Sequence, residues 1–220
     1  MPNSRIDFMI KRLRYSEKQA KKWYDKVYLH GGYKSADPRY DDKMLDQLGV
    51  PTNMNLNLLD IACGNGFLLH AAEKRTKTFG MDISENAVKN AKLRAKRTLF
   101  SCGSAEKLPF PDEFFDFVTC LGSMEHFINV DTALTEIKRV LVNGGKANLH
   151  VPNSLYLVHK LLRVDTQGQP NERLATEAEW REIIEKHLTI ENVHKYNTRP
   201  YLAWIPKKYC CHFTFICRKE

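Results

Sequence analysis

The sequence predicts an α/β fold with a doubly wound, Rossmann-like parallel sheet. Apolar runs of strand length alternate with amphipathic stretches of helix length, and the first apolar run leads into a Gly-x-Gly turn. This alternation requires crossover connections, which are right-handed between parallel strands. We therefore expect strands near residues 56–61, 77–82, 98–102, 115–121 and 146–151, and helices near 66–74, 84–95 and 131–141.

Local signals define the ends of several elements. Ser84 is expected to cap the helix that follows it. The helix near 131–141 is expected to end at the glycine pair Gly144 and Gly145. Thr176 begins a capping-box pattern with an acid three residues later. The C-terminal part is expected to form a helix at 176–187 and two strands at 189–196 and 209–217.

Residues 1–48 are predicted to form a helical lid that belongs to a single domain with residues 49–220, the cofactor-binding part. Apolar side chains recur at helical spacing over residues 4–30, and a further short helix is expected at 40–48. These helices precede the sheet and would cover the mouth of a site at its edge. Residues 153–173 carry turn-forming side chains and are interpreted as an insertion.

Composition narrows the class of protein. The 220 residues contain no apolar run long enough to span a membrane, and the N-terminus lacks the apolar core of a secretory signal. The six cysteines form no C-x-x-C pair and no zinc spacing, so we expect a cytoplasmic protein with no metal site. The net charge of +8 is compatible with an anionic partner, although solvated helix faces are the favoured explanation of the basic residues.

A turn at residues 58–67, with the sequence LLDIACGNGF, is the strongest functional signal. Gly64 and Gly66 allow the backbone to approach a ligand beside the open N–H groups of a helix start. Leu69 stands where a dinucleotide fingerprint needs its third glycine, and no P-loop pattern is present. Asp60 would repel a pyrophosphate and would suit a ligand with an ammonium group. The turn therefore predicts a nucleotide-like cofactor that is not a dinucleotide.

A second acid lies at the expected tip of the neighbouring strand. Asp82 ends the run at 77–82, where doubly wound folds bind ribose hydroxyls. Its carboxylate can accept hydrogen bonds from both the 2′- and the 3′-hydroxyl.

Three further motifs follow LLDIACGNGF at 58–67 and Asp82 in order: AEKLPF at 105–110, FDFV at 115–118 and RVLVNGG at 139–145. The series resembles class I S-adenosylmethionine-dependent methyltransferases, and in particular the type 11 group that includes ubiquinone and menaquinone methyltransferases. The similarity covers roughly residues 56–153. It implies a seven-stranded sheet of order 3-2-1-4-5-7-6 with the last strand antiparallel, and S-adenosyl-L-methionine as the cofactor.

The resemblance also implies a set of cofactor-binding residues. The glycine turn would surround the methionine part, Ile83 would lie against adenine, and the N–H of Ala105 would pair with a ring nitrogen. Ser104 departs from the family, which usually has Asp there to accept from the adenine amine. The full set is Asp60, Ala62, Gly64, Gly66, Asp82, Ile83, Ser104, Ala105, Leu121, Tyr24 and Tyr28, with Tyr33 as a further lid aromatic.

His126 is the histidine closest in sequence to the expected reaction site, after the fourth strand. Its ordinary pKa suits proton removal near neutral pH. It is a candidate general base, with a positioning or a structural role as the alternatives, and Glu125 is the next catalytic candidate. The acceptor pocket is expected to draw on His150, Asn153, Tyr156, Arg199, Tyr201 and Trp204.

The leading functional hypothesis is in-line transfer of a methyl group to an O, N or C nucleophile of a small-molecule acceptor. The basic charge keeps a tRNA or RNA methyltransferase as an alternative, although no appended RNA module is visible. A non-catalytic cofactor-binding or protein-interaction module of the same fold is another. A further possibility places the basic segment 5–22 on an anionic membrane beside a lipid acceptor.

Overall fold

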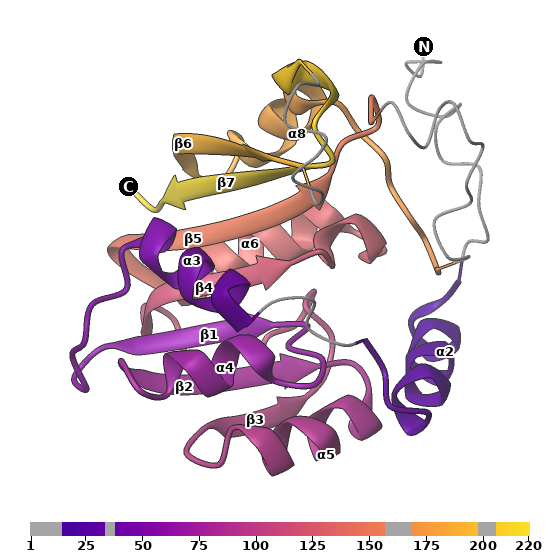
Figure 1. Ribbon diagram of the computed structural model, residues 1–220, viewed down its shortest axis with the longest axis vertical. Coiled ribbons are helices and arrows are strands. Elements are labelled where there is room, and N and C mark those ends of the chain that lie inside the picture. The colour runs from indigo at the N-terminus through magenta and orange to yellow at the C-terminus, as the bar shows by residue number, and fades with distance from the viewer. Residues whose placement is uncertain (1–14, 34–37, 157–168, 198–205) are drawn as a thin grey trace.

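The computed structural model describes residues 15–33, 38–156, 169–197 and 206–220. A seven-stranded sheet runs through the molecule in the order β3-β2-β1-β4-β5-β7-β6 (Figure 1). The order confirms the topology that the family resemblance implied. The strands are β1 (Asn57–Ile61), β2 (Lys77–Asp82), β3 (Leu99–Cys102), β4 (Phe115–Leu121), β5 (Leu141–Pro152), β6 (Thr189–Tyr196) and β7 (His212–Arg218).

The direction of the strands places several chain ends at one edge of the sheet. β1 pairs in parallel with β2 and with β4, and β5 continues the parallel set beside β4. β7 is antiparallel to both β5 and β6. The carboxyl ends of β1 to β5 therefore meet at a common edge, which is where open α/β sheets bind their ligands.

Helices cover both faces of the sheet, with α3, α4 and α5 on one face and α6 on the other (Figure 1). Ser84 caps α5 through the N–H of Ala87, and Thr176 forms the expected capping box with Glu179. The segment at 1–14, part of the helical stretch expected at 4–30, lies outside the described residues. The helices are α2 (Glu17–Leu29), α3 (Pro38–Leu48), α4 (Phe67–Ala72), α5 (Glu85–Arg94), α6 (Val130–Val140) and α8 (Glu177–Ile184), with 3-10 turns η1 (Met124–His126) and η3 (Lys207–Tyr209).

The expected glycine stop after α6 is wrong. The helix ends at Val140 and the chain enters β5 directly at Leu141, so the two glycines lie inside the strand. Gly144 has φ +77°, and its N–H donates to the carbonyl of Lys219 at 2.9 Å. The glycine pair allows β5 to bend next to the end of β7, and it does not terminate the helix.

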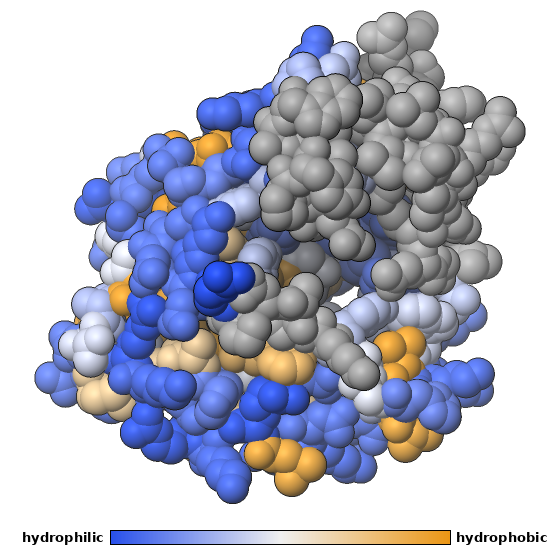
Figure 2. Space-filling model, viewed as in Figure 1, coloured by the Kyte–Doolittle hydropathy of each residue, from blue (hydrophilic) through white to orange (hydrophobic). Residues whose placement is uncertain are grey.

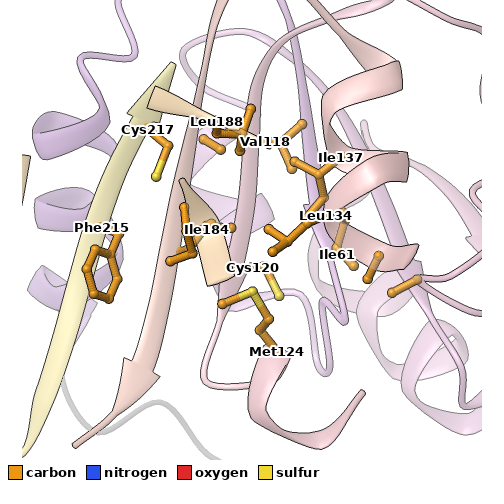
Figure 3. Packing of buried hydrophobic residues seen from close by; sticks show 14 of the residues in the cluster. Ile61, Val118, Cys120, Met124, Leu134, Ile137, Ile184, Leu188, Phe215 and Cys217 are labelled. Carbon is orange, nitrogen blue, oxygen red and sulfur yellow. The ribbon is translucent and has the colours of Figure 1, made fainter. Parts of the chain in front are cut away.

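Apolar side chains fill both sides of the sheet and fix the helices to it. On one side, α6 and α8 pack against β1, β4 and β7, with Ile137, Ile184 and Phe215 fully buried (Figure 3). On the other side, α3 and α4 pack through Leu45 and Leu69. The described part of the face in Figure 2 is mainly hydrophilic, with scattered apolar side chains. No helix within the described residues is long and apolar enough to cross a membrane.

Candidate active site

The loop after β1 has an unusual backbone. Ala62, Gly64 and Gly66 have φ values of 57°, 52° and 71°, all in the left-handed region. A non-glycine residue is strained there, and such strain concentrates at functional sites. The N–H of Cys63 donates to the carbonyl of Met81, which fixes the loop to the end of β2. The loop is therefore held in a tight bend beside the second strand tip.

The two glycines of the turn have different neighbours. A Cβ on Gly64 would lie 2.7 Å from Tyr28 Oη, so a side chain there would collide with the hydroxyl group of Tyr28 on α2. A Cβ on Gly66 would lie 2.9 Å from the Cβ of Ala91, on α5. Gly64 faces the cavity described below, whereas Gly66 allows α5 to pack closely against the loop.

Asp82 joins the loop to the next helix. Its Oδ2 accepts from the Gly64 N–H and its Oδ1 accepts from the Ser84 N–H, both at 2.9 Å. The carboxylate is 5% exposed. Burial raises the pKa of Asp82 to about 6, against the opposing effect of these two N–H bonds. A carboxylate held this rigidly can still accept further hydrogen bonds through its remaining lone pairs.

Asp60 lies at the end of β1 and is also buried. Its Oδ1 accepts from Thr119 Oγ1 at 2.6 Å, across the β1–β4 pair. Burial raises the pKa of Asp60 to about 7, and the nearby charges of Asp41 and Asp82 add to the rise. A cationic ligand bound beside Asp60 and Asp82 would favour the ionised form of both buried carboxylates.

The lid helix α2 lies over this loop and is bonded to α5. Ser84 Oγ donates to Asp25 Oδ1 at 2.7 Å, and Lys21 Nζ lies 3.0 Å from Glu85 Oε1. This docking brings Tyr24 and Tyr28 over the site, where burial raises the pKa of both phenols above its ordinary value. The two phenols therefore remain protonated hydrogen-bond donors at neutral pH.

Residues after β3 and β4 complete the wall. Ser104 Oγ accepts from the Glu106 N–H at 3.3 Å, so this hydroxyl already helps to form the turn after β3. The carbonyl of Leu121 accepts from Ser123 Oγ at 3.3 Å.

His126 and Glu125 follow in η1 and are both buried. Nδ1 of His126 lies 3.0 Å from the carbonyl of Pro170, which can only accept, so Nδ1 carries the proton and Nε2 keeps its lone pair. Burial lowers the pKa of His126 to about 4 and raises the pKa of Glu125 to about 8. At neutral pH the imidazole is therefore neutral and the Glu125 side chain is predominantly protonated.

One cavity of about 710 Å³ connects the glycine loop, the carboxylates of Asp60 and Asp82, the lid tyrosines and His126. Gly66 and Glu125 do not line it, and neither do Asn153 and Tyr156. Arg199, Tyr201 and Trp204 lie outside the described residues. The sequence-predicted residues that line the cavity are Tyr24, Tyr28, Tyr33, Asp60, Ala62, Gly64, Asp82, Ile83, Ser104, Ala105, Leu121, His126 and His150.

Some lining residues were not predicted. Tyr40 and Lys43 come from α3, Tyr196 from β6 and His212 from β7. None of these residues belongs to a recognisable motif, so only tertiary packing brings them to the cavity. Among the described residues, no cluster of three or more His, Cys, Asp or Glu side chains could hold a metal ion.

Comparison with known proteins agrees with this geometry. An uncharacterised protein of Methanocaldococcus jannaschii is 38% identical over 101 residues, 46% of this chain and 43% of that protein. The ubiquinone/menaquinone biosynthesis C-methyltransferase UbiE of Rickettsia bellii is 34% identical over 107 residues, 43% of each chain. These alignments span less than half of each relative. The crystal structure of the 4+2 cyclase SpnF shares the fold, with a TM-score of 0.71 at 19% identity over 94% of this chain and 98% of that one.

The fold, the site and these relatives define the class: the chain carries a class I S-adenosylmethionine-dependent methyltransferase domain. Residues 59–149 match the methyltransferase-domain family of type 11. This match supports, for that part of the chain, the resemblance that the sequence motifs indicated.

Proposed function

We propose that this chain transfers a methyl group from S-adenosylmethionine to an O, N or C atom of a small-molecule acceptor. The proposal rests on one cavity. The glycine loop and the buried carboxylates of Asp60 and Asp82 line one side of it, and the neutral imidazole of His126 lines another. A fold relative is a cyclase by name, so the fold does not fix the reaction. The site must therefore support the assignment.

The residues of the cavity fit the cofactor. The absence of a Cβ at Gly64 lets the Tyr28 hydroxyl group of the lid approach the backbone of the turn. Asp82 would hold the ribose hydroxyls, Asp60 would face the ammonium group directly or through water, and Ile83 would lie against adenine. Tyr28 would cover the methionine part from the lid. Carboxylates at these positions suit a ligand that is a cation, whereas they would repel the pyrophosphate of a dinucleotide.

When bound, S-adenosylmethionine supplies a methyl group that its sulfonium charge has already activated. The protein then contributes alignment of the acceptor and exclusion of water. The walls at Leu121 and the lid aromatics Tyr24 and Tyr28 would provide both. Alignment of reactants is worth up to about 7–11 kcal/mol of the barrier, so these positioning residues would supply the larger share of catalysis.

His126 would accept a proton where the acceptor is a hydroxyl or an ammonium group. Its Nε2 has the lone pair, and the Pro170 carbonyl fixes the tautomer through Nδ1. The lowered pKa makes His126 a weaker base than the ordinary imidazole expected from the sequence, so its contribution lies at the lower end of the range of about 10²–10⁴ in rate. A carbon or free amine acceptor would not need this proton transfer, and His126 would then position the acceptor only.

Calorimetric titration of an Asp82→Ala variant with S-adenosylmethionine tests the proposal. We expect affinity to fall about 100-fold, because hydrogen bonds to a charged group contribute about 1.5–3 kcal/mol each. Asp112→Ala is the matched control, since this exposed carboxylate pairs with Arg139 away from the cavity. Equal affinity of wild type and Asp82→Ala would remove the ribose-binding role and with it the assignment of this cavity.

A further inference from the structure

The cavity extends beyond the residues that fit the cofactor. The cofactor side lies at the ends of β1, β2 and β3, whereas the remaining side is built on β5, β6 and β7, on the other side of β4. We call this remaining side the acceptor chamber. It contains the side chains of Tyr40, Lys43, His150, Tyr196 and His212.

Of the five chamber residues, only His150 was expected at the acceptor site from the sequence. All five lie outside residues 59–149, the stretch that matches the methyltransferase-domain family. The family match therefore does not extend to the chamber residues. The chemistry of the chamber can indicate which acceptor the enzyme uses.

The chamber wall consists of flat rings in contact with one another. The rings of His150 and His212 are stacked, with centroids 4.8 Å apart and planes at 24°. The ring of Tyr40 meets His150 edge-on at 5.9 Å, and Tyr196 lies 6.1 Å from it. Rings in such offset and edge-on arrangements favour another flat ring as their neighbour.

The central ring of the wall, His150, is neutral and held in place. Its Nδ1 lies 2.7 Å from Thr214 Oγ1, and the residue is 6% exposed. Burial, reinforced by the neighbouring His212, keeps the pKa of His150 well below its ordinary value. His150 therefore offers a ring surface and no charge to a ligand.

A lysine ammonium group lies at this wall. Lys43 Nζ is 4.3 Å from the centre of the Tyr196 ring, and the lysine is exposed. Among the described residues, Lys43 has no ion pair with any carboxylate. Its neighbour Asp41 also lines the cavity, but the charge of Asp41 interacts with Asp60 and Arg94. An ammonium group over a ring and beside a cavity is suited to an anionic group on a ligand.

We propose that the methyl acceptor is a planar aromatic acid, whose ring packs against His150, Tyr40 and Tyr196 and whose acidic group faces Lys43. This inference rests on the proposed function and specifies the substrate class of the same cavity. The ring would be oriented by contacts on its faces and edges, and Lys43 would select acids over neutral analogues.

The test uses benzoate, 2-naphthoate and indole-3-carboxylate as probes, each compared with its neutral amide. Binding to the full chain is measured by ligand-observed NMR titration, with and without saturating S-adenosylhomocysteine. We expect at least one acid to bind about fivefold more tightly than its amide, the effect of one partly exposed ion pair. In the Lys43→Gln variant, acid and amide should bind with about equal affinity. Lys89 is an exposed lysine on α5 outside the cavity, so the Lys89→Gln variant should keep the preference for the acid.

Three results would overturn the inference: no acid binds, acids and amides bind equally, or Lys43→Gln keeps the preference for acids. Thermal melting of each variant, with wild-type values expected for both exposed lysines, excludes a folding defect. S-adenosylhomocysteine affinity is measured in parallel. Normal affinity combined with one of these three results rejects only the acceptor class, whereas absence of that affinity in the wild type rejects the proposed function.

Discussion

The two sides of the cavity are built in different ways. The cofactor side uses a strained loop and a buried carboxylate, and Asp82 is bonded to backbone N–H groups at residues 64 and 84. The acceptor chamber uses side chains from α3, β5, β6 and β7 that contact one another mainly through their rings. The first side is fixed by backbone geometry, and the second by packing between distant parts of the chain.

This difference suggests a division of labour. A backbone-bonded site tolerates few substitutions, which suits a cofactor that is common to a whole family. A chamber of side chains can change its shape and charge without disturbing the sheet, which suits a variable acceptor. Each of the following predictions separates the two sides or tests a residue between them.

The largest expected effect concerns His126, which stands between the two sides. His126→Ala should lower kcat by about 100-fold when the acceptor must lose a proton, the lower end for a general base because the pKa of His126 is lowered, and should leave S-adenosylmethionine affinity unchanged. Steady-state kinetics and calorimetry on the same preparation check both parts. His187→Ala is the control, because its ring pairs with Asp131 at 2.9 Å outside the cavity. A normal kcat would assign His126 a positioning or structural role.

Gly64→Ala tests whether the contact between Gly64 and Tyr28 shapes the cofactor side. Both Gly64 and Gly49 have left-handed φ angles, so alanine should cost about 1–2 kcal/mol of stability at either position. A Cβ on Gly49 meets nothing within 4 Å, whereas one on Gly64 meets Tyr28 Oη at 2.7 Å. We expect only Gly64→Ala to weaken cofactor binding, by roughly tenfold.

Chemical melts and calorimetry separate the stability and binding effects of Gly64→Ala. Adding Tyr28→Phe to Gly64→Ala removes the crowding oxygen and should restore part of the stability lost to that contact. Equal cofactor binding by the two single alanine variants would show that Tyr28 does not shape the site.

The pH dependence of cofactor binding follows from the two buried carboxylates. The pKa of Asp60 is raised to about 7 and that of Asp82 to about 6, so both are largely protonated at pH 5. A cationic ligand favours the ionised forms and should release protons on binding. Affinity should therefore rise roughly tenfold between pH 5 and pH 8. Calorimetry in buffers of different ionisation enthalpy measures the released protons, and their absence near pH 6 would contradict the assignment.

The same carboxylates predict the opposite trend for the cofactor-free fold. Between the ordinary value of 3.8 and the raised values, the folded chain binds more protons than the unfolded chain. The stability from these two groups is therefore fully present below about pH 4 and is lost as pH rises toward about 7. Thermal melts of wild type and Asp60→Asn across this range would isolate the contribution of Asp60, and identical pH trends would contradict it.

The smallest expected effect concerns the lid. Asp25→Ala removes the acceptor of Ser84 Oγ and loosens α2 from α5. Cofactor affinity should fall about twofold to fivefold, since a single partly exposed hydrogen bond contributes about 1 kcal/mol. Glu191→Ala, on β6 outside the cavity, is a carboxylate control. A change in acceptor KM alone, with cofactor affinity intact, would place the role of the lid on the acceptor side instead.

The sequence predicted the local structure at the ends of β1 and β2 well because its signals are local. The turn with Gly64, the strand tip at Asp82 and the cap at Ser84 each depend on a few neighbouring residues. Gly144 misled because its left-handed φ serves a bend within β5, a role that depends on the partner strand β7. Thr119 could not be predicted as the partner of Asp60, because that bond requires the pairing of β1 with β4.

Few residues of the acceptor chamber could be predicted from the sequence. His150 was expected there from its place after the fifth strand, but Lys43 and Tyr196 reach the same cavity only after the sheet has formed. Their contact joins α3 to β6, two elements about 150 residues apart. Ring and cation contacts at this separation follow no spacing rule, so the substrate class could be inferred only from the structure.

A crystal structure of the chain with S-adenosylhomocysteine bound would show where the nucleoside lies in the cavity. We expect the ribose hydroxyls to contact Asp82, the amino-acid part to lie at Gly64, and the acceptor chamber beyond Leu121 to stay open. A nucleoside bound elsewhere, or a Tyr28 ring that keeps the space beside Gly64 closed to the ligand, would contradict this expectation.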